Sequence, residues 1–294
     1  MRIAVSGSSG QVGWELMRRG QAAGDDMIGS DLPELDITEE TVVREWIDSV
    51  APDILINAAA YTAVDRAETD AQKARSVNAY GPRYLAGACR DANIPLIHIS
   101  TDYVFDGSAT VPYTEAAPTR PMGVYGRTKL EGELAVREIL DRHMIIRTAW
   151  VYGVQGQNFV KTMIRLAGER ETLRVVADQI GCPTFAGDLA DALLHIARVV
   201  CSHPSDTLNG TFHFCGSGSV SWHGFAEEIF RQARGRVPLQ LTSCQPIPTT
   251  AYPTPAQRPA YSVLDCARIR EVFGVSPRPW QIALSEMLSE WLPS

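Results

Sequence analysis

The stretch MRIAVSGSSGQVG, residues 1–13, decides the fold. A short strand-type run at 3–6 leads directly into a turn with a glycine at every third position, and a helical pattern follows over 11–23. Such a turn lets backbone N–H groups approach a phosphate, and the positive end of the helix points to the same place. We therefore expect a dinucleotide pyrophosphate here, although a tight strand-to-helix turn without a ligand has the same pattern. The residues expected at the pyrophosphate are Gly7, Gly10, Gln11, Val12 and Gly13.

Short apolar runs alternate with helical patterns through the first half of the chain. The runs of strand type lie at 27–30, 53–57, 95–100 and 144–150, and the helical patterns lie at 39–49, 71–92 and 125–141. This alternation predicts an α/β fold with a Rossmann-type, doubly wound parallel sheet. Ligands of such sheets bind at the carboxyl ends of the strands, which is where the polar motifs of this chain fall.

Beyond residue 150 the pattern loosens into shorter elements. Helical patterns lie at 159–169, 187–200, 222–234, 266–273 and 280–291, a short strand is expected at 211–215, and the proline-rich stretch 246–259 reads as a loop. We expect residues 1–152 plus about 188–216 to form the dinucleotide-binding domain. Residues of about 153–187 plus 217–294 are expected to form a smaller, discontinuous α/β domain for the substrate.

Composition excludes several classes of protein. The chain has 294 residues, 45% of them hydrophobic and 21% charged, which is typical of a globular protein. The net charge of −7 does not favour nucleic acid as a partner, and no apolar run is long enough for a membrane span. The six cysteines show no metal-binding spacing, and the N-terminus resembles a buried strand more than a secretory leader. We therefore expect a cytoplasmic protein with reduced thiols.

The pattern Tyr-x-x-x-Lys occurs at Tyr125 and Lys129, and Lys129 is one of only three lysines in the chain. An ammonium near a phenol favours the phenolate and lowers the pKa of the tyrosine, so that Tyr125 could exchange a proton with a substrate oxygen. Lys129, one helical turn further on, could also hold a nicotinamide ribose. An exposed pair at the start of a helix is the alternative interpretation of the same spacing.

Thr101 follows the expected strand at 95–100 and could hydrogen-bond the same substrate oxygen. A hydroxyl at the end of a strand also commonly closes a turn, and without Tyr125 that interpretation would be preferred.

Asp31 ends the second expected strand, 18 residues after Gly13. A carboxylate there can accept both hydroxyls of the adenosine ribose, which favours NAD over NADP. Arg18 and Arg19 could nevertheless accommodate a 2′-phosphate, so both NADH and NADPH stay open. Other residues expected beside the cofactor are Asp36 and Ile37 at the adenine, and the small residues Ala58, Ala59 and Ala60, which could equally serve strand–helix packing.

These motifs resemble those of the extended short-chain dehydrogenase/reductases, and more narrowly the dTDP-4-dehydrorhamnose reductase family. The resemblance runs nearly from end to end, and the matching segments are residues 10–16, 57–68, 100–107, 125–133, 147–152, 178–184 and 248–259. The last two segments lie in the expected substrate domain, so the resemblance indicates the class of substrate as well as the fold.

The resemblance implies NAD(P)H-dependent reduction of the C4 ketone of dTDP-4-dehydro-L-rhamnose, the last step of dTDP-L-rhamnose biosynthesis. It implies that Tyr125 is the proton donor, Lys129 its partner and cofactor ligand, and Thr101 a tuning hydroxyl. The residues implied at the substrate are Asp102 and Trp150 at the deoxysugar, and Arg258 at the diphosphate. Trp150 could instead be an ordinary core tryptophan.

The resemblance also implies that some relatives form dimers around a magnesium ion. One of its acidic ligands matches Glu15, but Gly187 stands where a second carboxylate is expected. We therefore expect no metal site, with Glu15 the one candidate ligand, and either a monomer or a homodimer.

Two other functions remain open at this point. One is a nucleotide-sugar epimerase or dehydratase of the same superfamily, although Asp102 is not followed by the second acid that a dehydratase usually needs. The other is a non-catalytic regulatory subunit that keeps the fold, although such relatives tend to lose the tyrosine or the lysine.

Overall fold

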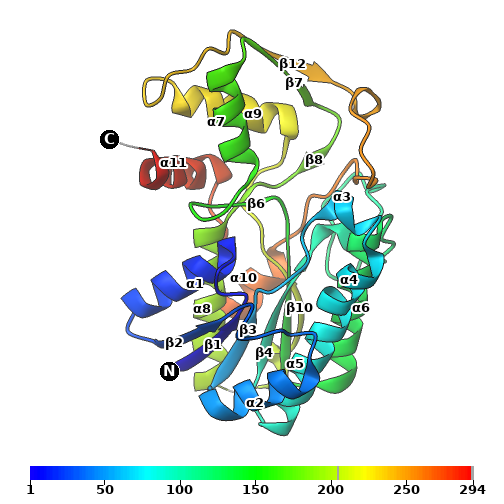
Figure 1. Cartoon of the computed structure of the whole chain (residues 1–294), viewed down its shortest axis with the longest axis vertical. Helices are drawn as coiled ribbons and strands as arrows, with labels where there is room; N and C mark the ends of the chain where they lie inside the picture. Colours follow the sequence, from blue (N-terminus) through cyan, green and yellow to red (C-terminus); the bar gives the residue numbers. More distant parts are fainter. Residues whose placement is uncertain (204, 293–294) are drawn as a thin grey trace.

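The computed structural model describes residues 1–203 and 205–292, and its centre is a parallel sheet (Figure 1). The strand order is β10-β5-β4-β3-β1-β2, and every neighbouring pair is parallel. The chain reverses its direction of growth between β1 and β3, which makes the sheet doubly wound. The strands are β1 (Arg2–Ser6), β2 (Asp26–Ser30), β3 (Ile54–Asn57), β4 (Leu96–Thr101), β5 (His143–Thr148) and β10 (Gly210–His213).

Helices cover both faces of this sheet because its strands are apolar on both sides. In β1, Ile3 and Val5 pack toward α1 (Gln11–Ala22) and α8 (Ala186–Ser202), while Ala4 packs toward the opposite layer. That layer consists of α2 (Glu40–Val50), α5 (Gly81–Asp91) and α6 (Val124–Ile139). The short helix α10 (Ala267–Phe273) packs on β10 at the edge of the sheet. The prediction of a Rossmann-type doubly wound sheet is confirmed.

The prediction of one continuous helix over 71–92 is wrong, because this stretch forms three helical segments. α4 (Ala71–Arg75) and α5 are joined by a π-helical turn over Ser76–Tyr80, and Pro82 follows in the first turn of α5. Proline has no N–H to donate, which interrupts the regular ladder. The displaced carbonyl of Asn78 packs against α6 so closely that a Cβ at Gly132 would lie 2.2 Å from its oxygen. The short helix α3 (Val64–Ala67) precedes α4.

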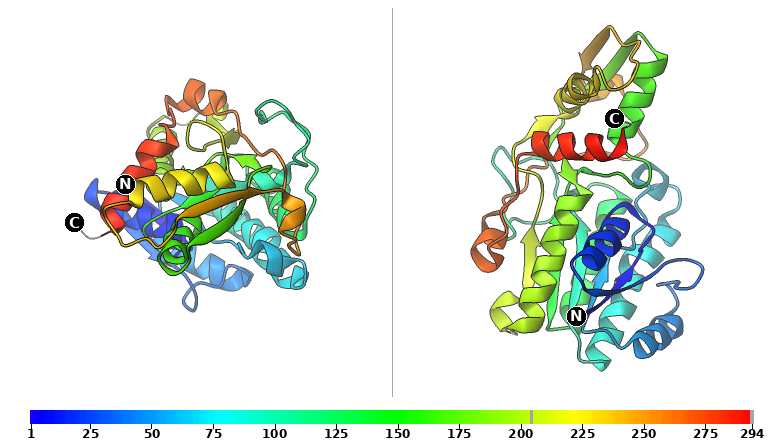
Figure 2. Two further views of the ribbon diagram at one scale, coloured as in Figure 1. Left: turned by 90° about the horizontal axis from the view of Figure 1, so that it is seen from above. Right: turned by 90° about the vertical axis from the view of Figure 1, so that its left-hand side faces the viewer.

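A smaller unit with its own apolar core lies above the carboxyl ends of the strands (Figures 1 and 2). Its elements are α7 (Phe159–Glu169), β7 (Thr172–Val176), α9 (Trp222–Ala233), β12 (Ser243–Ile247) and α11 (Trp280–Trp291). β12 pairs with β7, so the start of the expected 246–259 loop is in fact a strand. Its Pro246 is tolerated because β12 lies at the edge of a two-stranded pair.

Two pairs of very short strands connect the two units. β6 (Val151–Tyr152) pairs with β9 (Thr184–Phe185), and β8 (Ile180–Gly181) pairs with β11 (Val220–Ser221). The remaining elements are single 3₁₀ turns at Asp102–Val104, Asp206–Leu208 and Thr249–Ala251. None of the helices in the described residues is long and apolar enough to span a membrane.

Candidate active site

The predicted motifs meet at one edge of the sheet. Gly7 follows β1, Asn57 ends β3, Thr101 ends β4 and Trp150 is the second residue after β5. Because parallel strands end on the same side, these positions all face the smaller unit (Figure 1).

The glycine turn after β1 is too crowded for side chains at two positions. Gly7 has φ +77°, and a Cβ there would lie 2.5 Å from the backbone nitrogen of Ala59. A Cβ at Gly13 would lie 2.0 Å from the carbonyl oxygen of Gly7. The first turn of α1 has no side-chain cap and no acidic residue, so its N–H groups are free to donate hydrogen bonds to an anion. These features fit the pyrophosphate of a dinucleotide.

Asp31 lies beside this turn at the end of β2. Its carboxylate accepts hydrogen bonds from the backbone nitrogens of Ser9 (3.2 Å) and Leu32 (2.9 Å). The guanidinium groups of Arg18 and Arg19 are engaged by acidic residues of α1, α8 and α11. The structure therefore does not support our expectation that these arginines accommodate a 2′-phosphate.

The other predicted cofactor residues differ in where their side chains lie: some are at the phosphate turn, and others are buried or bonded elsewhere. The nitrogen of Ala59 donates to Asn57 Oδ1 at 3.0 Å, so the turn 58–60 is held against Gly7. Asp36 accepts from Thr38, and Ile37 is buried in the core between α2 and α5. The Ile37 side chain is therefore almost completely covered by the core, and its place beside an adenine stays a prediction. Gln11 instead reaches the smaller unit, because its Oε1 accepts from Asn158 Nδ2 at 3.0 Å.

Tyr125 lies in the first turn of α6, next to Thr101. Its ring packs edge-on against Tyr103, with centroids 5.4 Å apart. Burial raises the pKa of Tyr125 to about 12, and its hydrogen bond with Thr101 opposes this shift. The prediction of a lowered pKa is therefore wrong, because burial outweighs any effect of the lysine. A phenol with this pKa is protonated at neutral pH, the state that a proton donor requires.

Lys129 is almost completely buried one turn further along α6. Its Nζ donates to the carbonyl oxygen of Ile99 at 2.7 Å. Burial lowers the pKa of Lys129 to about 8, and the carboxylate of Glu133 opposes this shift. Glu133 itself forms a buried, bidentate pair with Arg147 of β5 (2.8 and 2.7 Å), which fixes α6 on the sheet.

Asp102 is buried beside Thr101 and has one free oxygen. The Thr101 hydroxyl donates to its Oδ1 at 3.0 Å, while Oδ2 has no partner among the described residues. Burial raises the pKa of Asp102 to about 6, and the nearby hydroxyl groups of Ser262 and Thr101 oppose this shift. A buried oxygen without a partner is costly, so Oδ2 is suited to accept a hydroxyl of a bound molecule.

Trp150 is half-buried and is held by the smaller unit. Its indole stacks on Trp222, with ring centroids 3.4 Å apart and planes 7° apart. A Cβ at Gly181 would lie 2.4 Å from the same indole, so only a glycine fits there. One face of Trp150 is therefore already occupied by another aromatic ring.

Arg258 forms a two-point ion pair with Asp65 of α3. Its Nη1 and Nη2 donate to Asp65 Oδ1 and Oδ2 at 3.0 and 2.7 Å. The hydrogen bonds from Arg258 lower the pKa of Asp65 despite its partial burial. The pair ties the loop after β12 to the sheet unit, and the Arg258 side chain stays 24% exposed.

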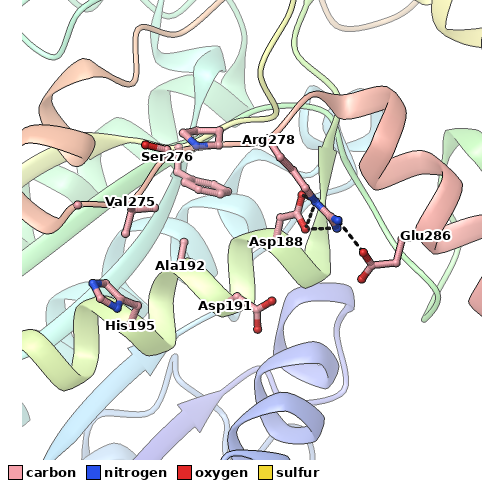
Figure 3. Close-up of a pocket in the computed structure, with 11 residues that line it drawn as sticks. Asp188, Asp191, Ala192, His195, Val275, Ser276, Arg278 and Glu286 are labelled. Atoms are coloured by element: carbon pink, nitrogen blue, oxygen red, sulfur yellow. Dashed lines mark hydrogen bonds and ion pairs between the residues drawn. The ribbon is translucent and has the colours of Figure 1, made fainter.

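The residues around Glu15 do not fit a metal ion. Glu15 is buried, and its Oε2 accepts hydrogen bonds from Arg18 (2.8 Å) and Arg19 (2.9 Å), while its Oε1 has no partner among the described residues. A Cβ at Gly187 would lie 2.3 Å from Arg19 Nη2, so the guanidinium fills the space of a side chain there. Nearby, Arg278 pairs with Asp188 and Glu286 (Figure 3). In the described residues no cluster of three metal-ligating side chains exists.

Two residues that support the backbone around the predicted site were missed in the sequence. The Glu68 carboxylate accepts from the backbone nitrogen of Val124 at 2.7 Å and so caps α6 just before Tyr125. Asn78 exchanges two hydrogen bonds with the backbone of Tyr61 (2.8 and 3.1 Å). Glu68 lies in the matching segment 57–68, which was the available indication of its importance.

Comparisons with known proteins agree with this geometry. A family model described as "RmlD substrate binding domain" matches residues 1–292. The dTDP-4-dehydrorhamnose reductase of Escherichia coli K12 is 42% identical over 99% of this chain and 98% of its own length, and that of Sinorhizobium fredii is 44% identical over 96% and 94%.

A solved structure of Bacillus anthracis dTDP-4-dehydrorhamnose reductase in complex with NADP has a TM-score of 0.91. It is 36% identical and covers 98% of this chain and 99% of that one. The family resemblance predicted from the motifs is confirmed. The chain therefore belongs to the family described by the RmlD substrate binding domain.

Proposed function

We propose that this protein is an NAD(P)H-dependent oxidoreductase that reduces the C4 ketone of dTDP-4-dehydro-L-rhamnose to give dTDP-L-rhamnose. The observation that carries the proposal is the placement of Tyr125 beside Thr101, with Lys129 one turn behind, at the carboxyl end of β4. The relatives named as reductases of this substrate match over nearly their whole lengths. The reaction would complete dTDP-rhamnose biosynthesis.

A reduced nicotinamide, when bound, supplies the hydride. The protonated phenol of Tyr125 gives its proton to the oxygen that becomes the new hydroxyl group. This transfer is favourable because an alkoxide is a stronger base than a phenolate. Thr101 can orient the same oxygen once its hydroxyl turns from Asp102 Oδ1 to donate to it. The Lys129 ammonium offers two further N–H donors to the cofactor ribose.

The roles of the remaining residues are part of the proposal. For the pyrophosphate we propose Gly7, Gly10, Gln11, Val12 and Gly13. Asp31 is proposed at the ribose, Asp36 and Ile37 at the adenine, and Ala58, Ala59 and Ala60 along the cofactor. For the substrate, we propose that Asp102 Oδ2 accepts a sugar hydroxyl, that Trp150 contacts the sugar with the part of its indole that Trp222 leaves open, and that Arg258 faces the diphosphate.

The domain boundaries are also part of the proposal, with one refinement of the expected division. We propose a cofactor domain of residues 1–152 plus about 188–216, joined by α10, and a substrate domain of about 153–187 with the rest of 217–294. We further propose a cytoplasmic location and no nucleic-acid partner, since the net charge is −7. Monomer and homodimer both stay open.

The decisive assay follows oxidation of the reduced nicotinamide with freshly prepared dTDP-4-dehydro-L-rhamnose, with NADH and NADPH in parallel. Stoichiometric oxidation together with formation of dTDP-L-rhamnose supports the proposal. An epimerase would instead retain its cofactor and convert the sugar without net oxidation.

A further inference from the structure

Three polar side chains form a row across the sheet beneath the proposed site. Ser6, Asn57 and His98 come from β1, β3 and β4, and the strand register places each directly opposite the next. All three side chains are completely buried. Buried polar groups must satisfy one another, so the hydrogen bonds of this row determine its protonation.

The backbone of Ala59 determines the direction of these hydrogen bonds. The backbone N–H of Ala59 can only donate, and it lies 3.0 Å from one of the two terminal atoms of the Asn57 amide group. That atom must be the acceptor, and it is therefore the oxygen Oδ1. Oδ1 also accepts from the Ser6 hydroxyl at 2.9 Å. The amide nitrogen of Asn57 must then face His98 Nδ1, which is 3.0 Å away.

An amide nitrogen only donates, so His98 Nδ1 must be an unprotonated acceptor. The imidazole is consequently neutral and carries its proton on Nε2, which is buried and has no hydrogen-bond partner among the described residues. A proton on Nδ1 would place two donors face to face in a buried position. Turning the Asn57 amide over would break its hydrogen bond with Ala59.

The row is connected to the proposed cofactor site in two places. The Ala59 turn, held by Asn57 in the middle of the row, packs so closely on the phosphate turn that a Cβ at Gly7 would lie 2.5 Å from the Ala59 nitrogen. At the His98 end of the row, Lys129 Nζ binds the carbonyl oxygen of Ile99, the residue that follows His98. Burial and the nearby Lys129 ammonium both lower the pKa of His98.

We propose that His98 is a positioning residue for the cofactor: a neutral imidazole, held as the Nε2–H tautomer, that fixes Asn57 and thereby the Ala59 turn against Gly7. Its neutrality also keeps a second positive charge away from Lys129. The proposal rests on the proposed function only in naming the ligand as a nicotinamide dinucleotide.

The tautomer can be observed directly in the unsubstituted protein. Histidine labelled in its ring nitrogens, followed by long-range nitrogen–proton correlation spectra, distinguishes protonated from unprotonated ring nitrogens for each of the six histidines. The signals absent from His98→Gln identify those of His98. We expect an unprotonated Nδ1 and a protonated Nε2 at neutral pH. A protonated Nδ1, alone or in an imidazolium, overturns the proposal.

Cofactor binding tests the positioning role. His98→Leu leaves the Asn57 amide without its acceptor and should raise the Kd of NADH or NADPH about tenfold. His98→Gln can supply an amide oxygen to the same N–H and should weaken binding clearly less. The matched control is His195→Leu, which removes an imidazole of α8 that bonds the carbonyl oxygen of Phe273, and it should leave Kd unchanged.

Equal weakening by Leu and Gln, or unchanged affinity in a His98→Leu protein that melts like the parent, refutes the positioning role. If His98→Leu does not fold, the spectrum of the parent and the affinity of His98→Gln still decide: a tenfold or greater loss with Gln counts against the proposal. A parent protein that binds neither cofactor refutes the proposed function instead, and the tautomer spectrum remains a separate measurement.

Discussion

Replacement of Tyr125 by phenylalanine separates proton transfer from every other role of this residue. The ring and its edge-on contact with Tyr103 remain, so no cavity forms. Only the hydroxyl group beside Thr101 is lost, and the net contribution of one such hydroxyl to folding is at most about 0.5–1.5 kcal/mol. The thermal midpoint and the Kd of the cofactor should therefore change little.

The rate should change far more than the stability. General acids contribute about 10²–10⁴-fold to turnover, which corresponds to about 3–5 kcal/mol of activation free energy. We expect a loss of kcat of this size, measured as nicotinamide oxidation at saturating substrate. Because the expected rate loss exceeds the expected stability loss, unfolding cannot account for it.

A matched control is Tyr113→Phe, which removes a hydroxyl that binds Asp106 (3.0 Å) outside the proposed site. It should leave kcat nearly unchanged. Turnover of the Tyr125→Phe protein within a few-fold of the parent would show that the proton comes from another group, and the assignment of Tyr125 would fall.

Four further results are expected. Turnover should fall as the pH rises through about 8, because burial lowers the pKa of Lys129 to about this value and its ammonium form is lost above it. A pH profile of kcat that stays flat well beyond pH 8 would contradict the role of Lys129. Asp31→Ala should shift kcat/KM toward NADPH, because the carboxylate that would repel a 2′-phosphate is gone; an unchanged NADH/NADPH ratio places Asp31 away from the ribose. Arg258→Ala should raise KM for the nucleotide sugar about ten- to a hundredfold, with a smaller effect on kcat. Asp65→Asn, which frees the guanidinium of Arg258, should not raise KM, and equal effects of the two changes would indicate a purely structural ion pair. A metal chelator should leave the thermal midpoint and activity unchanged, because Arg19 fills the space beside Glu15; a clear fall in either would contradict the absence of a metal.

Local patterns in the sequence predicted the parts of the site that depend on neighbouring residues. The turn at Gly7 and the helical spacing of Tyr125 and Lys129 are short-range features, because strand, turn and helix each follow from a few consecutive residues. The structure places them at one edge of the sheet, as parallel strand order requires.

Contacts between distant residues could not be predicted in the same way. Arg258 and Asp65 are 193 positions apart, and nothing near either of them indicates the other. Trp150 meets Trp222 only because β8 and β11 bring the smaller unit over the end of β5. The pKa of Tyr125 also depends on burial, which three-dimensional packing determines.

At Gly187 the sequence alone predicts a missing metal ligand but does not give the physical reason for its absence. The sequence indicates that a carboxylate is missing there, but only the structure shows that Arg19 fills the vacant space. A side chain at 187 and the present position of this guanidinium exclude each other, since a Cβ alone would lie 2.3 Å from Nη2. Arg19 joins Glu15 to Asp191 at 2.9 and 2.7 Å, so an internal cation already neutralises the carboxylates that a metal would need. Binding a divalent ion at Glu15 would first require breaking these ion pairs, and this cost is the physical basis for expecting the protein to be independent of metal.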